Sequence, residues 1–218
     1  MMRNTKFTMH ILTFDTETQK GKAFLACTYN GQDENVFFIN SKEDVIKFFV
    51  WMHGQTKIGF CYNLGYDISS LIKYFGQQAI IDFYVERPLI FEHDDFKYEL
   101  SGFINKFIKL SKLSTTTING EIKTSREITF FYDICQYYEF MSLDKAAKKY
   151  LGEKKDDIPK KWKKNMLRYF ENPQHKNKII KYCKKDARLT HRLTTRFIGM
   201  LIQAGIITEE KIKTSRYY

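Results

Sequence analysis

The chain has 218 residues, of which 43% are hydrophobic and 16% aromatic, and its formal net charge is +11. This composition excludes a mainly disordered chain, and no apolar run in the sequence reaches the length of a membrane-spanning helix or of a secretory signal. The four cysteines are scattered without a CxxC pair, so we expect reduced thiols and a cytoplasmic protein, not a disulfide framework or a zinc site. The positive charge indicates a polyanionic partner, although a soluble lysine-rich surface has the same composition.

The first third of the chain predicts strands interleaved with helices. Apolar, β-branched runs bounded by turn residues indicate strands, and a capping residue followed by acidic residues and a helical apolar pattern indicates a helix. The expected elements are, in chain order, a strand that contains Asp15, a hairpin that turns at Asn30-Gly31, a helix over 41–52, a short buried strand over 57–63 and a helix over 67–75 that stops at Gly76.

The rest of the chain predicts strands and then helices. The expected elements are strand pieces within 80–134 that include a hairpin turning at Asn119-Gly120, a helix over 142–151 ended by Gly152, a basic connector over 153–164 and a long helix over 178–203. We therefore expect an α/β protein with a mixed β-sheet flanked by helices. It forms a single domain over 1–218, with a β-hairpin insertion at about 88–130.

Two carboxylates lie one residue apart in the first strand. Because side chains alternate along a strand, Asp15 and Glu17 point to the same face, and Phe14 and Thr16 point to the other. Two like charges side by side repel each other unless a positive charge lies between them. The pair is therefore either a solvated strand end or one part of a cation site.

Further carboxylates come from two other segments. Asp67 follows a short strand at the start of a helix, where a lone aspartate usually stabilises the helix N-terminus, and Asn63 and Tyr66 precede it in the pattern N-x-x-Y-D. Tyr182 and Asp186 are four residues apart on the long helix and so share one face, although such an aspartate commonly pairs with nearby lysines. The same spacing at Tyr29 and Asp33 falls in a predicted turn and places no pair on one face.

In this order the three motifs resemble those of DEDD-type 3′–5′ exonucleases. They are most similar to the proofreading domain of family B DNA polymerases, particularly the protein-primed enzymes of phages and mobile elements. The stretch FFYDICQYYEFMSLDKAAKKYLG also resembles the segment that precedes the third motif in that family. The resemblance covers most of the chain and implies an RNase H-like fold. It also implies a two-metal, Mg²⁺- or Mn²⁺-dependent hydrolysis of single-stranded DNA from its 3′ end, with no small-molecule cofactor.

The resemblance assigns roles to residues of this chain. The implied metal ligands are Asp15, Glu17, Asp67 and Asp186. Tyr182 would orient the attacking water or help to deprotonate it, and because Lys181 occupies the position where another subgroup has histidine, the tyrosine subgroup fits better. The implied contacts of the 3′-terminal nucleotides are Thr18, Asn63 and Tyr66. A lysine within 145–149, for which we favour Lys148, would hold the scissile phosphate.

Several alternatives stay open at this stage. The chain is either a free-standing exonuclease or a proofreading part that works beside a DNA polymerase domain or subunit. A catalytically inactive module that binds single-stranded nucleic acid and an RNA-directed exonuclease are further possibilities. Ile134 and Cys135 depart from the hydroxyl residue and leucine that the protein-primed family usually has there, which puts one strand contact in doubt. The arms of the Asn119-Gly120 hairpin and the KKWKK segment around Trp162 are candidate guides for the nucleic acid strand.

Overall fold

A computed structural model describes residues 11–118 and 121–208 of the chain. The strands are β1 Leu12–Gln19, β2 Lys22–Tyr29, β3 Glu34–Phe38, β4 Ile58–Cys61, β5 Leu89–His93, β6 Phe96–Phe103, β7 Phe107–Ile118 and β8 Glu121–Asp133. They form one eight-stranded sheet in the order β3-β2-β1-β4-β8-β7-β6-β5. β4 pairs in parallel with both β1 and β8, and the other neighbours are antiparallel, which confirms the predicted mixed sheet.

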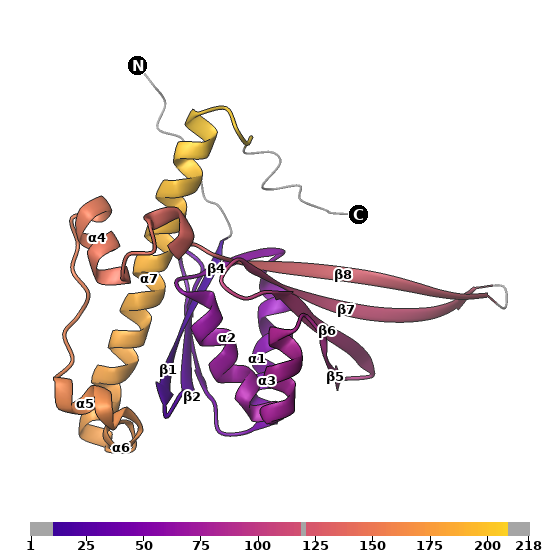
Figure 1. Cartoon of the computed structure of the whole chain (residues 1–218), viewed down its shortest axis with the longest axis horizontal. Helices are drawn as coiled ribbons and strands as arrows, with labels where there is room; N and C mark the ends of the chain where they lie inside the picture. The colour runs from indigo at the N-terminus through magenta and orange to yellow at the C-terminus, as the bar shows by residue number, and fades with distance from the viewer. Residues whose placement is uncertain (1–10, 119–120, 209–218) are drawn as a thin grey trace.

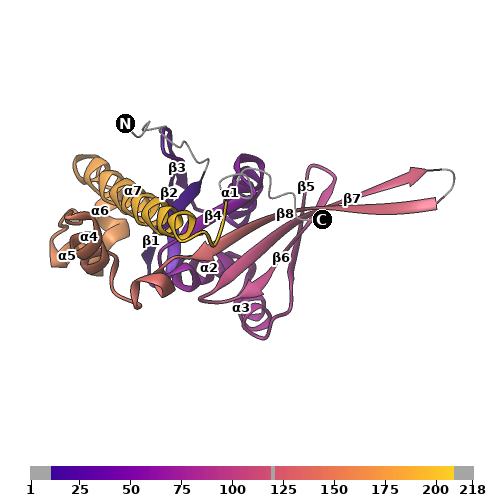
Figure 2. The same ribbon diagram turned by 90° about the horizontal axis from the view of Figure 1, so that it is seen from above.

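Helices cover both faces of the sheet. They are α1 Lys42–Gln55, α2 Leu64–Ile72, α3 Gln77–Tyr84, α4 Leu143–Leu151, α5 Lys160–Lys164, α6 Met166–Phe170 and α7 Pro173–Gln203, with short 3₁₀ helices η1 Lys73–Phe75 and η2 Cys135–Tyr138. One face carries α1, α2 and α3, and α7 crosses the other face with α4, α5 and α6 beside it (Figures 1 and 2). Within the described ranges, no helix has both the length and the apolar character needed to cross a bilayer.

Local signals account for the helix ends. The Ser41 side chain accepts a hydrogen bond from the Asp44 amide and the Asp44 carboxylate accepts one from the Ser41 amide, so the predicted capping box begins α1. Gly152 ends α4 in the left-handed conformation, as predicted. The long helix starts at Pro173, five residues before the predicted Lys178, because Asn172 caps it and proline is favoured in the first turn.

The core lies in separate clusters on the two faces of the sheet. Phe14 is fully buried and makes edge contacts with Phe48 of α1 and Phe131 of β8, at ring-centroid distances of 6.0 and 5.8 Å. On the opposite face, the first half of α7 packs with α5 and α6, and its second half packs with α4 and η2. The side chains of β1 therefore alternate between the α1–α2 face and the α7 face.

The predicted hairpin insertion is larger than a hairpin. Residues 89–133 form the four strands β5 to β8, and β8 belongs to the central sheet through its pairing with β4. The pairing of β6 with β7 ends at Lys97 and Leu113, beyond which β7 and β8 continue as a two-stranded ribbon that projects from the body (Figures 1 and 2). The predicted turn at Asn119-Gly120 lies outside the described residues.

Candidate active site

The site forms where β4 ends and its neighbour β1 continues. The parallel pairing of β1 with β4 stops at Phe14 and Cys61, so the next part of β1 has no β4 partner on that edge. The Asp67 carboxylate of α2 fills this position: its Oδ1 accepts hydrogen bonds from the Thr16 amide at 2.8 Å and the Thr16 hydroxyl at 2.6 Å. The Cys61 thiol donates to Oδ2 at 3.4 Å. Asp67 is thus fixed against the edge of β1.

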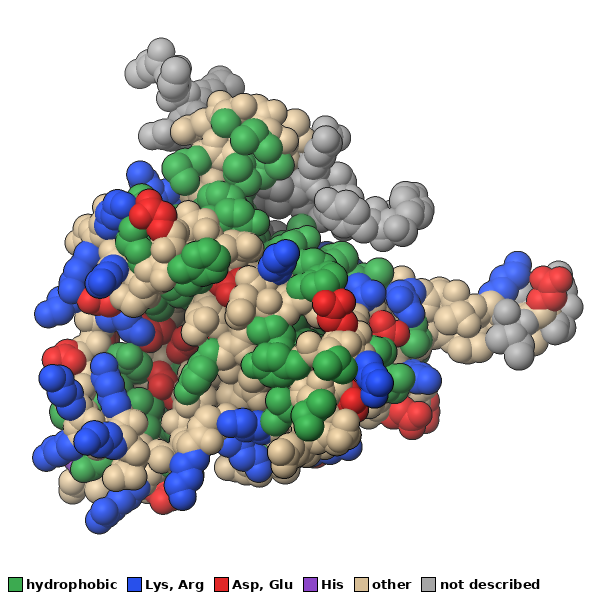
Figure 3. Space-filling model, viewed as in Figure 1, with side chains coloured by type: hydrophobic (Ala, Val, Ile, Leu, Met, Phe, Trp, Pro, Cys, Tyr) green, Lys and Arg blue, Asp and Glu red, His purple; other side chains and the backbone are tan. Residues whose placement is uncertain are grey.

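Asp15 and Glu17 point toward α7, on the same side of β1, as the alternation of side chains predicts. One potential ligand atom from each of Asp15, Glu17 and Cys183 lies within 4.8 Å of the others. Asp186 follows Cys183 by three residues on α7 and is buried. All four predicted carboxylates line one cavity of about 540 Å³. In the space-filling view, acidic side chains lie inside a hollow whose left rim carries Lys and Arg side chains (Figure 3).

Crowding and burial hold protons on these carboxyl groups. Burial raises the pKa of Asp15 and of Glu17 well above the usual range, and the charge of Asp186 raises both further. Burial also raises the pKa of Asp67 to about 7, although its hydrogen bonds oppose this effect. The pKa of Asp186 rises to about 6 by burial, against the opposing charge of Lys155. The surrounding protein therefore compensates only part of the negative charge that four ionised carboxylates would have.

Lys155 provides the positive charge nearest to the cluster and was not singled out from the sequence. Its ammonium group forms an ion pair with Asp186 Oδ2 and lies 5.1 Å from the centre of the Tyr182 ring. Burial lowers the pKa of this ammonium, but the Asp186 and Asp15 carboxylates outweigh burial and raise it, so Lys155 stays charged. One signal for this position is present in the sequence: Ile158 is the only apolar residue in the segment 153–158, whose other residues are all charged. It is buried against α5, α6 and α7, which holds the connector that contains Lys155 close to α7.

Lys148, the lysine favoured from the sequence, lies elsewhere. It is on α4, half exposed, and pairs with Asp144 one turn earlier at 2.6 Å. It is not among the described residues that line the cavity, whereas Lys155 is. The pair with Asp144 on the surface of α4 accounts for the position of Lys148. Lys155, and not Lys148, is the lysine next to the four carboxylates.

Tyr182 is buried beside the carboxylates and lines the same cavity. Burial and the charge of Asp186 raise the pKa of its hydroxyl. The phenol therefore keeps its proton at neutral pH and can donate a hydrogen bond. Of the two roles predicted for Tyr182, this favours orienting a water molecule over removing its proton.

The predicted nucleotide contacts lie at the rim of the cavity. The Thr18 hydroxyl and the Tyr66 hydroxyl are 2.5 Å apart, and the Tyr66 ring is half exposed. Asn63 has a left-handed backbone (φ 65°) between β4 and α2, and its side chain lines the cavity. Asp133 fixes this turn by accepting hydrogen bonds from the backbone amides of Asn63 at 3.0 Å and Leu64 at 3.1 Å. Thr18, Asn63 and Tyr66 thus stand together beside the carboxylates.

The segment after η2 forms a wall that the sequence did not predict. The residues of this wall that line the cavity are Phe140, Met141, Ser142 and Leu143. The Phe140 side chain is 71% exposed on a backbone with φ 52°, directly after Glu139 with φ 55°. Two successive left-handed residues other than glycine are uncommon, and no residue type here indicates this backbone from the sequence.

No family model, curated protein or solved structure matches the chain. The residues of the cavity themselves therefore indicate the function.

The donor set fits a divalent cation. Carboxylate oxygens are the ligands that Mg²⁺ and Mn²⁺ prefer, and four carboxylates meet in this cavity. Asp186 Oδ1 is buried and has no hydrogen-bond partner among the described residues, so it has an unused acceptor. A bound cation would satisfy this atom and offset the burial and mutual repulsion that raise the pKa values of Asp15 and Glu17.

The KKWKK segment is not an exposed aromatic surface. Trp162 lies in α5, where its ring is buried and stacks on Tyr169 at 5.0 Å and packs on His175 at 4.5 Å between ring centroids. A base cannot stack on a ring that is already covered, so Trp162 anchors the connector to α7. That the lysines of the KKWKK segment guide a nucleic acid strand stays a prediction.

Proposed function

We propose that the chain is a divalent-metal-dependent 3′–5′ exonuclease of the DEDD tyrosine subgroup that shortens single-stranded DNA. The observation that carries this proposal is the meeting of four carboxylates in one cavity with Tyr182 and Lys155. These carboxylates come from three distant segments, β1, α2 and α7, each of which has the sequence motif that the subgroup requires.

The strand order supports an RNase H-like fold. Three antiparallel strands, β3, β2 and β1, continue into the parallel strands β4 and β8, and helices cover both faces. In this proposal the strands β5 to β7 are additions at the far edge of the sheet. The carboxylates then belong to the centre of the sheet, where β1 meets β4.

In the proposed reaction, water attacks the terminal phosphodiester. A new bond forms between the water oxygen and phosphorus, and the bond from phosphorus to the 3′ oxygen of the preceding nucleotide breaks. The products are a nucleoside 5′-monophosphate and a strand with a new 3′ hydroxyl. Mg²⁺ or Mn²⁺, held by the four carboxylates, would supply charge stabilisation for the phosphoryl group and lower the pKa of the attacking water.

The side chains of the chain have separate tasks in this step. The protonated Tyr182 hydroxyl donates a hydrogen bond that orients the attacking water, and the Lys155 ammonium balances the negative charge that develops on the phosphate. The Thr18–Tyr66 pair and Asn63 stand at the rim, where the terminal sugar and base would lie. Positioning and charge are the main contributions that a protein makes to phosphoryl transfer, and this cavity has groups for both.

A labelled strand tests the proposal. A 5′-labelled single-stranded DNA is incubated with the protein and Mg²⁺ or Mn²⁺, next to the Asp15→Ala/Glu17→Ala variant and an Asp33→Ala control from the exposed β2–β3 turn. We expect stepwise shortening from the 3′ end by the parent and the control, and none by the double variant. An RNA strand of the same sequence decides the sugar preference. Absence of cleavage of either strand in both metals, with folded protein, would overturn the proposal.

A further inference from the structure

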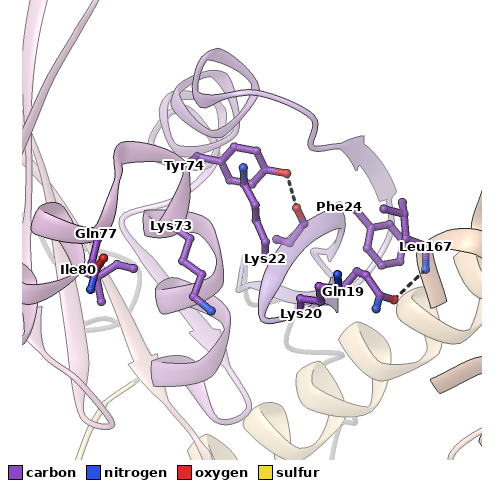
Figure 4. Close-up of a pocket in the computed structure, with 10 residues that line it drawn as sticks. Gln19, Lys20, Lys22, Phe24, Lys73, Tyr74, Gln77, Ile80 and Leu167 are labelled. Atoms are coloured by element: carbon purple, nitrogen blue, oxygen red, sulfur yellow. Dashed lines mark hydrogen bonds between the residues drawn. The ribbon is translucent and has the colours of Figure 1, made fainter. Parts of the chain in front are cut away.

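A second cavity, of about 660 Å³, lies at the turn between β1 and β2. The turn forms one wall, η1 and the start of α3 form another, and α6 closes the end (Figure 4). Its floor is apolar, and its polar groups are three lysines and two glutamines: Lys20, Lys22, Lys73, Gln19 and Gln77. None of the residues that line it is acidic.

The three ammonium groups are available to an anion. Many lysines of this chain pair with carboxylates, but within the described ranges none of Lys20, Lys22 and Lys73 has a carboxylate at salt-bridge distance. The Lys73 ammonium lies against the turn itself, since a Cβ atom at Gly21 would be 2.4 Å from its Nζ. Lys20 has a left-handed backbone (φ 52°), a position that favours Asn, Asp or Gly, so the turn bears a conformational cost to present a lysine here.

Tyr74 adds a fixed aromatic surface. Its hydroxyl donates to the backbone oxygens of Ala23 at 2.6 Å and Ile39 at 2.9 Å, which holds the ring in place. The Lys22 ammonium lies 3.9 Å from the ring centroid (Figure 4). The fixed ring therefore holds the Lys22 ammonium beside the cavity, where it can pair with an anion such as the phosphates of a single-stranded nucleic acid.

The cavity lies near the candidate active site along β1. Gln19 lines the cavity two residues after Glu17, a distance of about 7 Å by the rise of a strand. Thr18 lies between them and contacts Tyr66 at the active-site rim. The Gln19 side chain is held by α5 and α6, since its Oε1 accepts from the Leu167 amide at 3.4 Å and its Nε2 donates to the Lys164 carbonyl at 3.3 Å.

We propose that this cavity binds the backbone of the nucleotides behind the 3′ end of a single strand, with phosphates on Lys20, Lys22 and Lys73. This inference rests on the proposed function for the direction of the strand. It makes affinity depend on strand length: a dinucleotide, whose single phosphate is the scissile one, fills the carboxylate site alone, and a longer strand also reaches the lysines.

The test measures binding without cleavage. Fluorescence anisotropy compares the dinucleotide d(TpT) and oligo(dT) of 12 nucleotides in Ca²⁺. The proteins are the parent, the variant Lys20→Ala/Lys22→Ala/Lys73→Ala and the control Lys47→Ala/Lys57→Ala/Lys97→Ala, whose lysines line neither cavity. We expect the first variant to lose about tenfold or more in affinity for the 12-mer and less than twofold for the dinucleotide. Three lost phosphate contacts should also reduce the slope of log affinity against log salt by about 2. The control should keep the parental slope.

Three results would overturn the inference. Equal losses for the dinucleotide and the 12-mer would show a general charge effect, and so would an equal loss in the control. Displacement of the 12-mer by thymidine monophosphate at equal concentration would show a free-nucleotide site. Failure of the proposed function is a separate outcome, because it appears as absence of cleavage in Mg²⁺. In that case a loss of binding by the lysine variant that is specific to the 12-mer would still establish the lysine cavity as a nucleic acid site.

Discussion

Replacing Asp67 by asparagine should stabilise the protein and abolish its activity. The rise of the Asp67 pKa from 3.8 to about 7 corresponds to about 4 kcal/mol of differential free energy between its protonated and ionised forms. Between these two pH values the folded chain keeps the proton while the unfolded chain loses it. The carboxyl therefore lowers the free energy of unfolding progressively from pH 4 to pH 7, and by the full amount above pH 7.

Asparagine has the same shape and no titration. Its side-chain oxygen can still accept the hydrogen bonds from the Thr16 amide and hydroxyl. The gain in unfolding free energy of Asp67→Asn over the parent should therefore increase by about 4 kcal/mol between pH 4 and pH 8.

Urea unfolding in EDTA at pH 4, 6 and 8 measures this difference, with Asp33→Asn in the exposed β2–β3 turn as the control. A stability difference that does not change with pH, or one that decreases toward pH 8, would refute the electrostatic account of the site.

Three further predictions concern single side chains. Lys155→Met should lower kcat for strand cleavage by about 10²–10³-fold, because a charge beside the reacting phosphate is lost, whereas single-turnover rates of Lys148→Met should stay within about threefold of the parent. Tyr182→Phe should lower kcat about tenfold and leave the shape of the pH–rate profile between pH 7 and 10 unchanged, because the raised pKa of Tyr182 keeps the parental hydroxyl protonated there. If the parental rate changes with pH in this range and that of the variant does not, Tyr182 does not act as a proton-bearing donor. Trp162→Ala should lower the free energy of unfolding by about 3–5 kcal/mol in urea titrations and leave the salt dependence of strand binding unaltered.

Much of the fold follows from local signals in the sequence. The capping box at Ser41 and the left-handed Gly152 are set by backbone hydrogen bonds within a few residues, so their prediction needed no tertiary information. Helix α3 was not predicted because only Phe83 of its eight residues is buried, which leaves almost no apolar period to detect. The apolar pattern predicts too late a start for α7 because its first turn is polar, and only the Asn172-Pro173 pair marks where the helix begins.

The sequence predicts those parts of the candidate site in which a single strand or helix fixes the relative positions of two side chains. Alternation in a strand fixes the common face of Asp15 and Glu17, and the helical repeat fixes that of Tyr182 and Asp186. Lys155 was not predictable in the same way. It lies in an irregular connector with several neighbouring charges, and only the packing of that connector against α7 decides which charge meets Asp186.

The position of Asp186 on α7 ties the site to the global stability of the molecule. Ile179 packs in the cluster with α5 and α6, whereas Leu189 and Leu193 pack in the cluster with α4, so buried contacts flank Asp186 on both sides. Fraying of either end of the helix leaves the other cluster in place. We therefore expect the backbone amides around Asp186 to exchange with deuterium only through whole-molecule unfolding, and heat inactivation to coincide with the cooperative melting transition.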